Sequence, residues 1–396
     1  MTLSDLFTAD EREFLSGLRR DLHRHPELSW QELRTQERLE RALRERGITN
    51  VASVAKTGLV AIVPGRETNA PPIALRGDID ALPITEATGL DFASSVPGVM
   101  HACGHDVHAS WAVGAALLLA RHPATGEVRV VFQPAEEVGE GASAVLASGA
   151  LDGVQAIFGA HVDRRFAVGE VVAQEGPLSA STDSFTITLH GAGAHGARPQ
   201  EARDPIVGAA ELILALQTVV SRRLDPALPG VVTVGVVQAG RAANVIPDCA
   251  ELRGTVRATT PESRELLVGE IGRMAHAVAA THRLRAEVSF TEGTPPVVNS
   301  RDGAAWAAEA VRSVLGEEAL VPLGTTNMGG EDFAFYLERM PGCFLRVGAR
   351  EVGGERIAAH SSRFHAAEEA LFVGAAVLAQ CARVASAAVR SHGSRS

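Results

Sequence analysis

The sequence predicts an α/β protein, in which helices cover a mixed sheet and a separate ferredoxin-like α+β domain is inserted. Three observations support this prediction. At 396 residues the chain is longer than one hydrophobic core usually serves, so two domains are expected. Short apolar runs alternate with helical stretches, as in a sheet covered by helices. Near residue 182 this pattern gives way to the order β-α-β-β-α-β, and it resumes after Pro295.

The first part of the chain carries two helical periods and then a series of short apolar runs. In order, the predicted elements are helices at 10–24 and 31–45, strands at 58–63 and 73–76, a helix at 109–120, a strand at 128–132, a helix at 142–146 and a strand at 156–161. In such sheets, sites form in the loops beyond the strand ends. Asp78, Glu137 and His161 stand at such positions.

The middle of the chain predicts a complete ferredoxin-like unit. Its elements are a strand at 183–190, a helix at 204–222, strands at 230–237 and 248–257, a helix at 261–280 and a strand at 284–290. We therefore expect an inserted domain at 182–292, within a catalytic domain made of 1–181 and 293–396. The α/β pattern then continues with a helix at 303–315, a strand at 343–347 and a helix at 367–388.

Composition excludes several classes of protein. The net charge of −10 and the absence of basic runs argue against nucleic acid as a partner. The stretch 1–11 has no basic or long apolar segment, and no stretch is expected to span a bilayer, so neither a signal peptide nor a membrane partner is predicted. Four cysteines lie too far apart for a disulfide framework, which predicts a reduced, cytoplasmic location: Cys103, Cys249, Cys343 and Cys381.

Potential metal ligands are concentrated at residues 100–108, Met-His-Ala-Cys-Gly-His-Asp-Val-His. This segment holds one thiol, three imidazoles and a carboxylate. A disulfide cannot explain it, because it contains a single cysteine. For this stretch alone, a solvated histidine-rich loop is the alternative. That alternative weakens further along, because Glu137, His161 and His360 also follow apolar runs or lie in the loops after them.

The candidate metal ligands are Cys103, His105, Glu137, His161 and His360. Thiolate, imidazole and carboxylate together favour zinc, manganese, cobalt or nickel over magnesium or calcium. Five ligands exceed one tetrahedral zinc site, so we predict two divalent ions that share a bridging group. The alternative is one closed site that only stabilises the fold. The scatter of the ligands from position 103 to position 360, beside further carboxylates, weighs against it.

Three more carboxylates accompany these ligands. Glu136 precedes Glu137, and neighbouring side chains at a strand end diverge, so one can bind metal while the other faces water. Glu136 is then the candidate general base, with a solvated loop carboxylate as the alternative. Asp78 and Asp80 form a second acidic pair. One of them is expected to orient a ligating imidazole, although a turn or helix-capping role is also plausible for Asp78.

The inserted domain offers three further candidates. His195 lies in a glycine-rich turn after a strand, in the other domain from the ligands. It could stabilise a developing oxyanion or simply shape the turn. Asn244 and Arg257 offer an amide and a guanidinium to polar groups of a substrate, although each is a weak signal by itself.

Together these residues resemble the M20 metallopeptidase and amidohydrolase family, and most closely its aminoacylase and hippurate hydrolase branch, which includes the plant auxin-conjugate hydrolases. The resemblance covers nearly the whole chain. The Cys-Gly-His-Asp and Pro-Ala-Glu-Glu elements are the most specific parts. The motifs that carry the resemblance lie at 20–27, 78–83, 100–108, 133–137, 193–199, 244–248, 328–333 and 360–361.

The resemblance implies a two-metal catalytic domain and an inserted lid domain that usually forms a dimer. The five candidate ligands match the family's metal positions, and Glu136 matches its general base. Asp80 matches the acid that orients a ligand, with Asp78 as a rival. His195 matches a lid histidine that reaches the partner subunit's site in dimeric relatives. Gln200 stands where a histidine is common, and Met-Gly-Gly at 328–330 replaces Gly-Ser. Both departures bear on the substrate and not on catalysis.

The leading hypothesis is a metal-dependent amidohydrolase that cleaves the amide bond of small N-acyl-amino acids and forms a homodimer through its inserted domain. Zinc or manganese is expected, with cobalt or nickel as alternatives. A dipeptidase or carboxypeptidase, or a deacetylase of a metabolite such as acetyl-diaminopimelate or acetyl-cysteine, would use the same reaction with a different pocket. An inactive relative that only binds metal or ligand is a third possibility, which the presence of Glu136 and of all five ligands disfavours.

Overall fold

The computed structural model describes residues 3–393, and the chain divides into two compact units. Unit 1 consists of Met1–Gly176, Asn299–Thr325 and Asp332–Ser396, and unit 2 of Pro177–Val298 and Thr326–Glu331. Unit 2 is longer at both ends than the inserted domain expected at 182–292. The reason is a short ladder between β7 (Gly176–Ser179) and β14 (Val297–Asn299), which the apolar pattern did not reveal.

Unit 1 is built on a seven-stranded mixed sheet with the order β1-β2-β4-β3-β5-β15-β6. The four central strands β4, β3, β5 and β15 are parallel, while β1, β2 and β6 run antiparallel to their neighbours. The strands are β1 (Val51–Val54), β2 (Gly58–Val63), β3 (Ile73–Asp78), β4 (Val128–Gln133), β5 (Ala156–Ala167), β6 (Val171–Val172) and β15 (Gly342–Arg350). The predicted mixed sheet is confirmed, and the carboxyl ends of β3 and β4 are level, because Asp78 pairs with Gln133.

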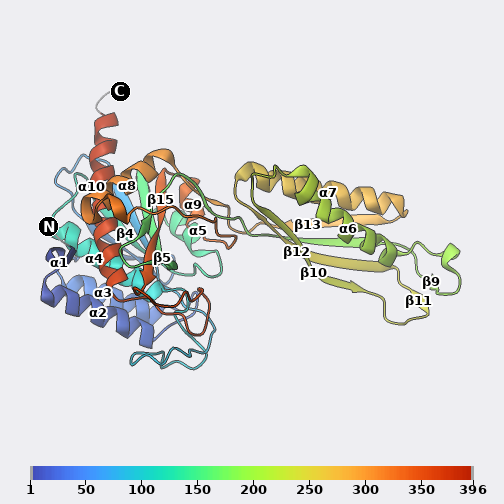
Figure 1. The fold of residues 1–396 in the computed structure, drawn as a ribbon, viewed down its shortest axis with the longest axis horizontal. Helices are drawn as coiled ribbons and strands as arrows, with labels where there is room; N and C mark the ends of the chain where they lie inside the picture. Colours follow the sequence, from blue (N-terminus) through green and yellow to red (C-terminus); the bar gives the residue numbers. More distant parts are fainter. Residues whose placement is uncertain (1–2, 394–396) are drawn as a thin grey trace. The chain divides into compact units, whose positions relative to one another are not determined.

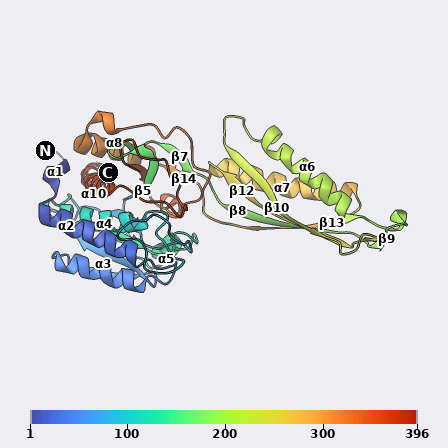
Figure 2. The ribbon, with the colours of Figure 1, turned by 60° about the horizontal axis from the view of Figure 1, so that its bottom comes forward.

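Helices cover both faces of this sheet (Figures 1 and 2). A side chain added at Gly77 of β3 would meet His108 of α4 on one face. One added at Gly159 of β5 would meet Phe333 beside α9 on the other. The helices of unit 1 are α1 (Leu3–Leu6), α2 (Ala9–Arg24), α3 (Leu33–Glu45), α4 (His105–Arg121), α5 (Gly141–Ala147), α8 (Arg301–Leu315), the short 3₁₀ turn η2 (Glu317–Ala319), α9 (Ala334–Leu337) and α10 (Glu369–Gly393).

Helix α4 begins at His105, earlier than the expected start at Ala109. The residues of its first turn are mostly polar, so the spacing of apolar residues that predicts a helix becomes visible only after that turn. The whole helix as far as Leu119 is nevertheless buried, and it packs on the sheet and against α10. His105 and His108 therefore lie on successive turns of one rigid helix and not in a loop.

Unit 2 is a four-stranded antiparallel sheet with the order β10-β12-β8-β13. Helices α6 and α7 lie on one of its faces (Figure 1), where Phe185, Ile187 and Leu189 of β8 are buried. This confirms the ferredoxin-like order. The elements are β8 (Asp183–His190), β9 (Ala194–His195), the 3₁₀ turn η1 (Pro199–Glu201), α6 (Pro205–Arg223), β10 (Gly230–Ala239), β11 (Val245–Ile246), β12 (Cys249–Ala258), α7 (Pro261–Thr281) and β13 (Arg285–Thr291).

Two helices, α6 and α10, are long and apolar enough to cross a membrane by length and composition alone. On that criterion, the expectation that no stretch would qualify was wrong. Core helices of soluble proteins pass the same test. The apolar window of α10 is 67% buried, and α6 places Ala209, Leu212 and Leu216 in the core of unit 2. Both helices therefore use apolar side chains to pack on a sheet.

Candidate metal centre

The five candidate ligands come from four segments of unit 1. Cys103 lies in the loop before α4, and His105 is the first residue of that helix. Glu137 follows β4, His161 lies within β5, and His360 lies in the loop between β15 and α10. The fold brings all five together, although they are spread over most of the sequence.

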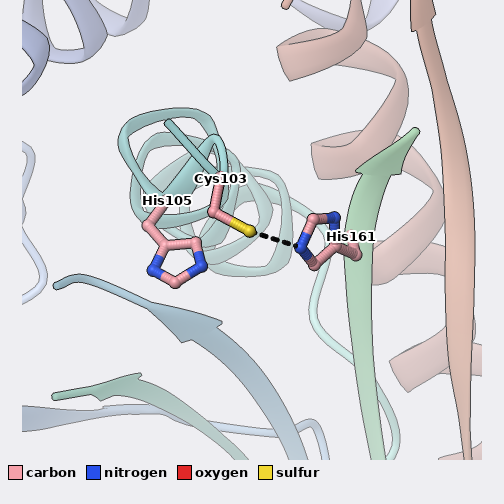
Figure 3. Close-up of side chains that lie close together, drawn as sticks. All are labelled: Cys103, His105 and His161. Atoms are coloured by element: carbon pink, nitrogen blue, oxygen red, sulfur yellow. Dashed lines mark hydrogen bonds between the residues drawn. The ribbon is translucent and has the colours of Figure 1, made fainter. Parts of the chain in front are cut away.

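Three of the ligands form a first cluster: Cys103, His105 and His161, whose donor atoms all lie within 4.8 Å of one another. Cys103 Sγ is 3.2 Å from His161 Nε2, and Figure 3 shows the thiol and both rings converging. His161 Nδ1 donates a hydrogen bond to the Val162 carbonyl at 2.7 Å. Because Nδ1 carries the proton, Nε2 presents a lone pair toward the cluster.

A second cluster consists of Cys103, Glu137 and His360, within the same 4.8 Å limit. His360 Nε2 lies 3.4 Å from Glu137 Oε2. Cys103 therefore belongs to both clusters. Two groups of three donors around one shared sulfur would offer ligands to two ions, as expected for a two-metal site.

The donor atoms that remain unsatisfied fit this interpretation. Among the described residues, His105 Nε2 and Glu137 Oε1 are both buried without a hydrogen-bond partner, 3.8 Å apart. Buried polar atoms in native proteins are nearly always paired, and a divalent cation would satisfy both. Thiolate, imidazole and carboxylate are also the donors that zinc and similar transition ions prefer. The residues present thus fit a pair of such ions.

Asp80 lies behind the ligands and orients two of them. Its Oδ1 is 3.3 Å from His105 Nδ1, and its Oδ2 accepts the Glu137 backbone N–H at 3.0 Å. A carboxylate on Nδ1 leaves Nε2 of the same ring free to bind metal. Burial raises the pKa of Asp80, but the hydrogen bond from His105 and its other partners outweigh burial and lower the pKa. Asp80, and not Asp78, therefore has the contacts expected of the orienting acid.

Asp78 holds a different histidine. Its Oδ1 is 2.6 Å from His108 Nδ1, and its other oxygen pairs with the fully buried Arg76. The Val162 N–H donates to His108 Nε2 at 3.0 Å. Both nitrogens of His108 are thus engaged by protein, so it fixes Val162, the neighbour of His161, and does not offer a ligand atom. No role was predicted for His108; its place one helical turn after His105 was the available signal.

Glu136 and Glu137 both face the centre. Their carboxylates are 3.9 Å and 3.8 Å from His105 Nε2. The expectation that these neighbouring side chains would diverge was therefore wrong. The strand has already ended, and Ala135 has the left-handed backbone angle φ of +53°, so the alternation of a β-strand no longer applies. Both carboxylates lie in one cluster with His105, and Glu137 also lies beside His360.

The centre carries protons that an ion must displace. Burial raises the pKa of the Cys103 thiol, and the nearby Glu137 carboxylate raises it further. Hydrogen bonds to Cys103 and Glu137 raise the pKa of His360 to about 10. Because metals bind the deprotonated forms of these groups, ion binding should release protons and weaken as the pH falls.

The candidates from the inserted domain lie in unit 2 and do not form one group. His195 pairs with Val245, and its Nδ1 accepts the Ala197 N–H at 3.1 Å. The Asn244 carbonyl accepts the Gly196 N–H at 2.8 Å, so His195 and Asn244 lie in two neighbouring exposed segments. Arg257 lies near the other end of β12 from this turn, roughly 25 Å along the strand at about 3.4 Å per residue. Their proposed contacts with substrate remain predictions.

Known proteins resemble this chain over most of its length. The sequence model of "Peptidase family M20/M25/M40" matches residues 74–384. N-acetylcysteine deacetylase of Bacillus subtilis is 43% identical over 371 residues, which are 93% of this chain and 96% of that protein. IAA-amino acid hydrolase ILR1-like 5 of Arabidopsis thaliana is 39% identical over 377 residues, 93% and 86% of the two chains.

Solved structures give the same result. The Bacillus subtilis YXEP protein, described as a dinuclear metal binding peptidase from the M20 family, aligns with a TM-score of 0.85 and 40% sequence identity. The alignment covers 96% of this chain and 99% of the other. Both units of the present fold are thus included in the likeness.

Proposed function

This chain belongs to peptidase family M20/M25/M40, and on that basis we propose that it hydrolyses the amide bond of N-acyl-amino acids with the aid of two divalent metal ions. The family resemblance inferred from the sequence is confirmed. The observation that carries the proposal is the pair of three-donor clusters sharing Cys103, with the Glu136 carboxylate beside them. Relatives named for deacetylation of N-acetylcysteine and hydrolysis of IAA-amino acids support an amide substrate.

The roles of the residues follow from their contacts. Divalent ions held by the five ligands would polarise the substrate carbonyl and lower the pKa of water; zinc or manganese is proposed, with cobalt or nickel as alternatives. Glu136 takes a proton from the attacking water and returns it to the leaving nitrogen. Asp80 keeps His105 and Glu137 in place during the reaction.

The division of labour between the two glutamates can be tested directly. Glu136→Gln should retain both ions and lose turnover by roughly 10²–10⁴-fold, the usual contribution of general acid–base catalysis. Glu137→Gln, the matched control, should lose an ion. Elemental analysis beside steady-state kinetics distinguishes the two. Near-normal turnover in Glu136→Gln would refute its role, and loss of metal there would mean that the two roles are exchanged.

The number of ions is tested at the shared sulfur. Cys103→Ala removes a donor from both clusters, so it should lose at least one ion and most of the activity. Elemental analysis of the fully loaded wild-type enzyme should find two transition ions per chain. A fully active enzyme with no more than one ion would exclude the two-metal centre.

The substrate is best identified by a screen. Metal-stripped protein refilled with zinc, manganese, cobalt or nickel is offered N-acyl-amino acids with acetyl, benzoyl and long-chain acyl groups, together with dipeptides. Similarity to N-acetylcysteine deacetylase makes a small acyl group the first candidate, as in the deacetylase alternative. Similarity to an IAA-amino acid hydrolase makes a larger acyl group the second candidate. Cleavage of dipeptides alone would support the peptidase alternative. If no substrate is cleaved with any of the metals, the result would support an inactive relative.

We further propose a homodimer formed through unit 2. Strand β10 is an edge of its sheet, and an edge strand offers unpaired backbone groups to a second chain. Unit 2 also exposes large apolar side chains on β10 and α6 that a partner could cover: Val231, Val237, Ile206, Val207 and Leu214.

A cytoplasmic location is proposed separately. All four cysteines are free, and free thiols are typical of a reducing compartment.

A dimer allows His195, which is exposed, to act in the partner's active site. In that case two inactive variants, His195→Ala and Glu136→Gln, should partly complement when mixed as heterodimers, because one of the two sites would then have both residues. Sedimentation gives the oligomeric state, and turnover of the mixed dimer gives the result. A fully active monomer would exclude the arrangement in trans. Verified heterodimers without activity would argue that His195 acts in its own chain or only shapes the turn.

A further inference from the structure

The turn that presents Glu136 and Glu137 is held by the protein at two backbone N–H groups. The first is that of Ala135, which donates to the Glu32 carboxylate at 2.9 Å. The second is that of Glu137, which donates to Asp80 at 3.0 Å. Glu136 lies between these two fixed points. Both attachments lead back to one short segment, 27–32, which precedes residues 74–384, the part matched by the family's sequence model.

Glu32 is fully buried, and its carboxylate is committed to this turn. Its second oxygen accepts a hydrogen bond from Thr57 Oγ1 at 2.6 Å. By position Glu32 is the N-cap of α3, yet its side chain does not cap the helix. The Glu27 carboxylate does so instead, because it accepts the N–H groups of Arg34 and Thr35. The Glu32 carboxylate therefore does not cap α3, and its buried contact with the Ala135 N–H serves to hold the turn at 135–137.

The backbone at Ala135 explains why such a contact is needed. Its φ of +53° lies in the left-handed region, which residues other than glycine enter at a cost. Such a conformation persists where surrounding contacts impose it. The Glu32 carboxylate fixes the Ala135 N–H, and the Ala135 carbonyl accepts the Gly141 N–H at 3.1 Å. The direction of Glu136 and Glu137 depends on this strained residue.

Ser29 acts on the other end of the turn. Its hydroxyl donates to Asp80 Oδ2 at 2.7 Å, the same oxygen that accepts the Glu137 N–H. The segment itself is tied beside Asp80, because the Ala81 N–H donates to the Glu27 carbonyl at 2.8 Å. Ser29 therefore fixes the rotamer of the carboxylate that also holds His105.

We propose that Glu32 and Ser29 are positioning residues, which fix both ends of the turn at 135–137 and thereby set the places of Glu136 and Glu137 at the metal centre. The inference rests on the proposed function, in which Glu136 is the general base and Glu137 a ligand. According to this inference, a segment that is far from the ligands in sequence keeps them in place.

The decisive variants differ only in the acceptor. Glu32→Met fills the same space without an oxygen, whereas Glu32→Gln keeps one oxygen for the Ala135 N–H. Glu32→Met should bind Zn²⁺ roughly 10–100-fold more weakly, the usual effect of losing such a contact behind a ligand. Its kcat should fall about tenfold or more while KM changes little. Glu32→Gln should recover most of both properties, because its amide oxygen can accept the same hydrogen bond.

Glu27→Met is the matched control. It removes a carboxylate of the same segment that also binds backbone N–H groups, but only those of α3. It should lower the thermal midpoint and leave Zn²⁺ affinity unchanged. Zn²⁺ affinity is measured by competition with a chromophoric chelator, which needs no substrate. If the wild-type enzyme cuts no N-acyl-amino acid, the proposed function fails, while the Zn²⁺ affinities still decide the positioning role.

Two results would overturn the inference. One is a folded Glu32→Met enzyme with wild-type Zn²⁺ affinity and kcat. The other is an equal loss of affinity in Glu27→Met, which would show a general effect of the segment's stability. If Glu32→Met does not fold, Ser29→Ala decides, because its side chain is small and only half-buried. About tenfold weaker Zn²⁺ binding supports the proposal, and unchanged binding rejects it.

Discussion

Gly104, between Cys103 and His105, is the position at which a single methyl group should disturb the metal centre most. It precedes α4 with a left-handed φ of +87°. An added Cβ would lie 2.4 Å from Val162 Cγ2, far closer than real contacts. For Gly104→Ala, the left-handed backbone costs about 1–2 kcal/mol. Overpacking adds about 1–3 kcal/mol. We therefore expect a destabilisation of about 2–5 kcal/mol.

The backbone of Val162 is bonded to two histidines of the centre. Its N–H donates a hydrogen bond to His108 Nε2, and its carbonyl accepts one from His161 Nδ1. A shift of Val162 would turn the His161 ring away from Cys103. Gly104→Ala should therefore weaken Zn²⁺ binding by roughly tenfold or more, in line with losses of contacts that orient ligands.

Gly98→Ala provides the matched control. Gly98 has a similar left-handed φ of +77°, but an added Cβ would meet nothing within 4 Å. It should lose only the backbone contribution, about 1–2 kcal/mol, and keep its affinity for Zn²⁺. Thermal unfolding of the metal-free proteins and chelator competition measure the two effects. The reasoning is refuted if Gly104→Ala is as stable as Gly98→Ala and binds Zn²⁺ like the wild type.

Two further predictions concern buried charges. Arg76 is fully buried beside Asp78 and Asp332, so Arg76→Met should remove the cation shared by two buried carboxylates and cost about 3–5 kcal/mol in unfolding experiments. A loss below about 1 kcal/mol would contradict this. For His23, burial alone lowers the pKa, but the Asp106 carboxylate outweighs it and raises the pKa from 6.5 to about 9. Because the pKa is higher in the folded protein, this contact contributes about 3 kcal/mol of stability below pH 6.5, which is lost as the pH rises through about 9. The thermal midpoint should therefore fall over this pH range, and His23→Gln should remove the dependence.

Much of the fold could be predicted from local patterns. The strands at 58–63 and 183–190 have the expected ends, because turn residues or a change of pattern delimit them. The two-residue strands β6, β9 and β11 were missed, since so few residues carry no period. Helix α4 was predicted too short, because its first turn is polar in sequence although it is buried in the fold.

The candidate ligands could be predicted by their chemistry, but their grouping could not. A thiol, imidazoles and carboxylates near strand ends are visible in the sequence. Which of them lie together depends on how the chain folds, and only the structure shows that Cys103 belongs to both clusters. Ser29 and Glu32 carry no signal at all in the sequence. They act on Asp80 and Ala135, which are 51 and 103 positions away.

The carboxylates around the centre divide into two kinds, and their burial follows from the division. Asp78, Asp80 and Glu32 are buried, and each holds a histidine ring or a backbone N–H next to a donor. Such groups need no access to solvent, because their partners belong to the protein. The side chains of Glu136 and Glu137, the proposed base and one proposed ligand, keep 10% and 9% exposure, which leaves both carboxylates within reach of solvent. Buried carboxylates are costly to keep in their charged form unless a positive charge lies nearby. Arg76 offsets that cost for Asp78, and the positive charge of two bound ions would offset it further. The proposed centre and the contacts behind it would then depend on each other.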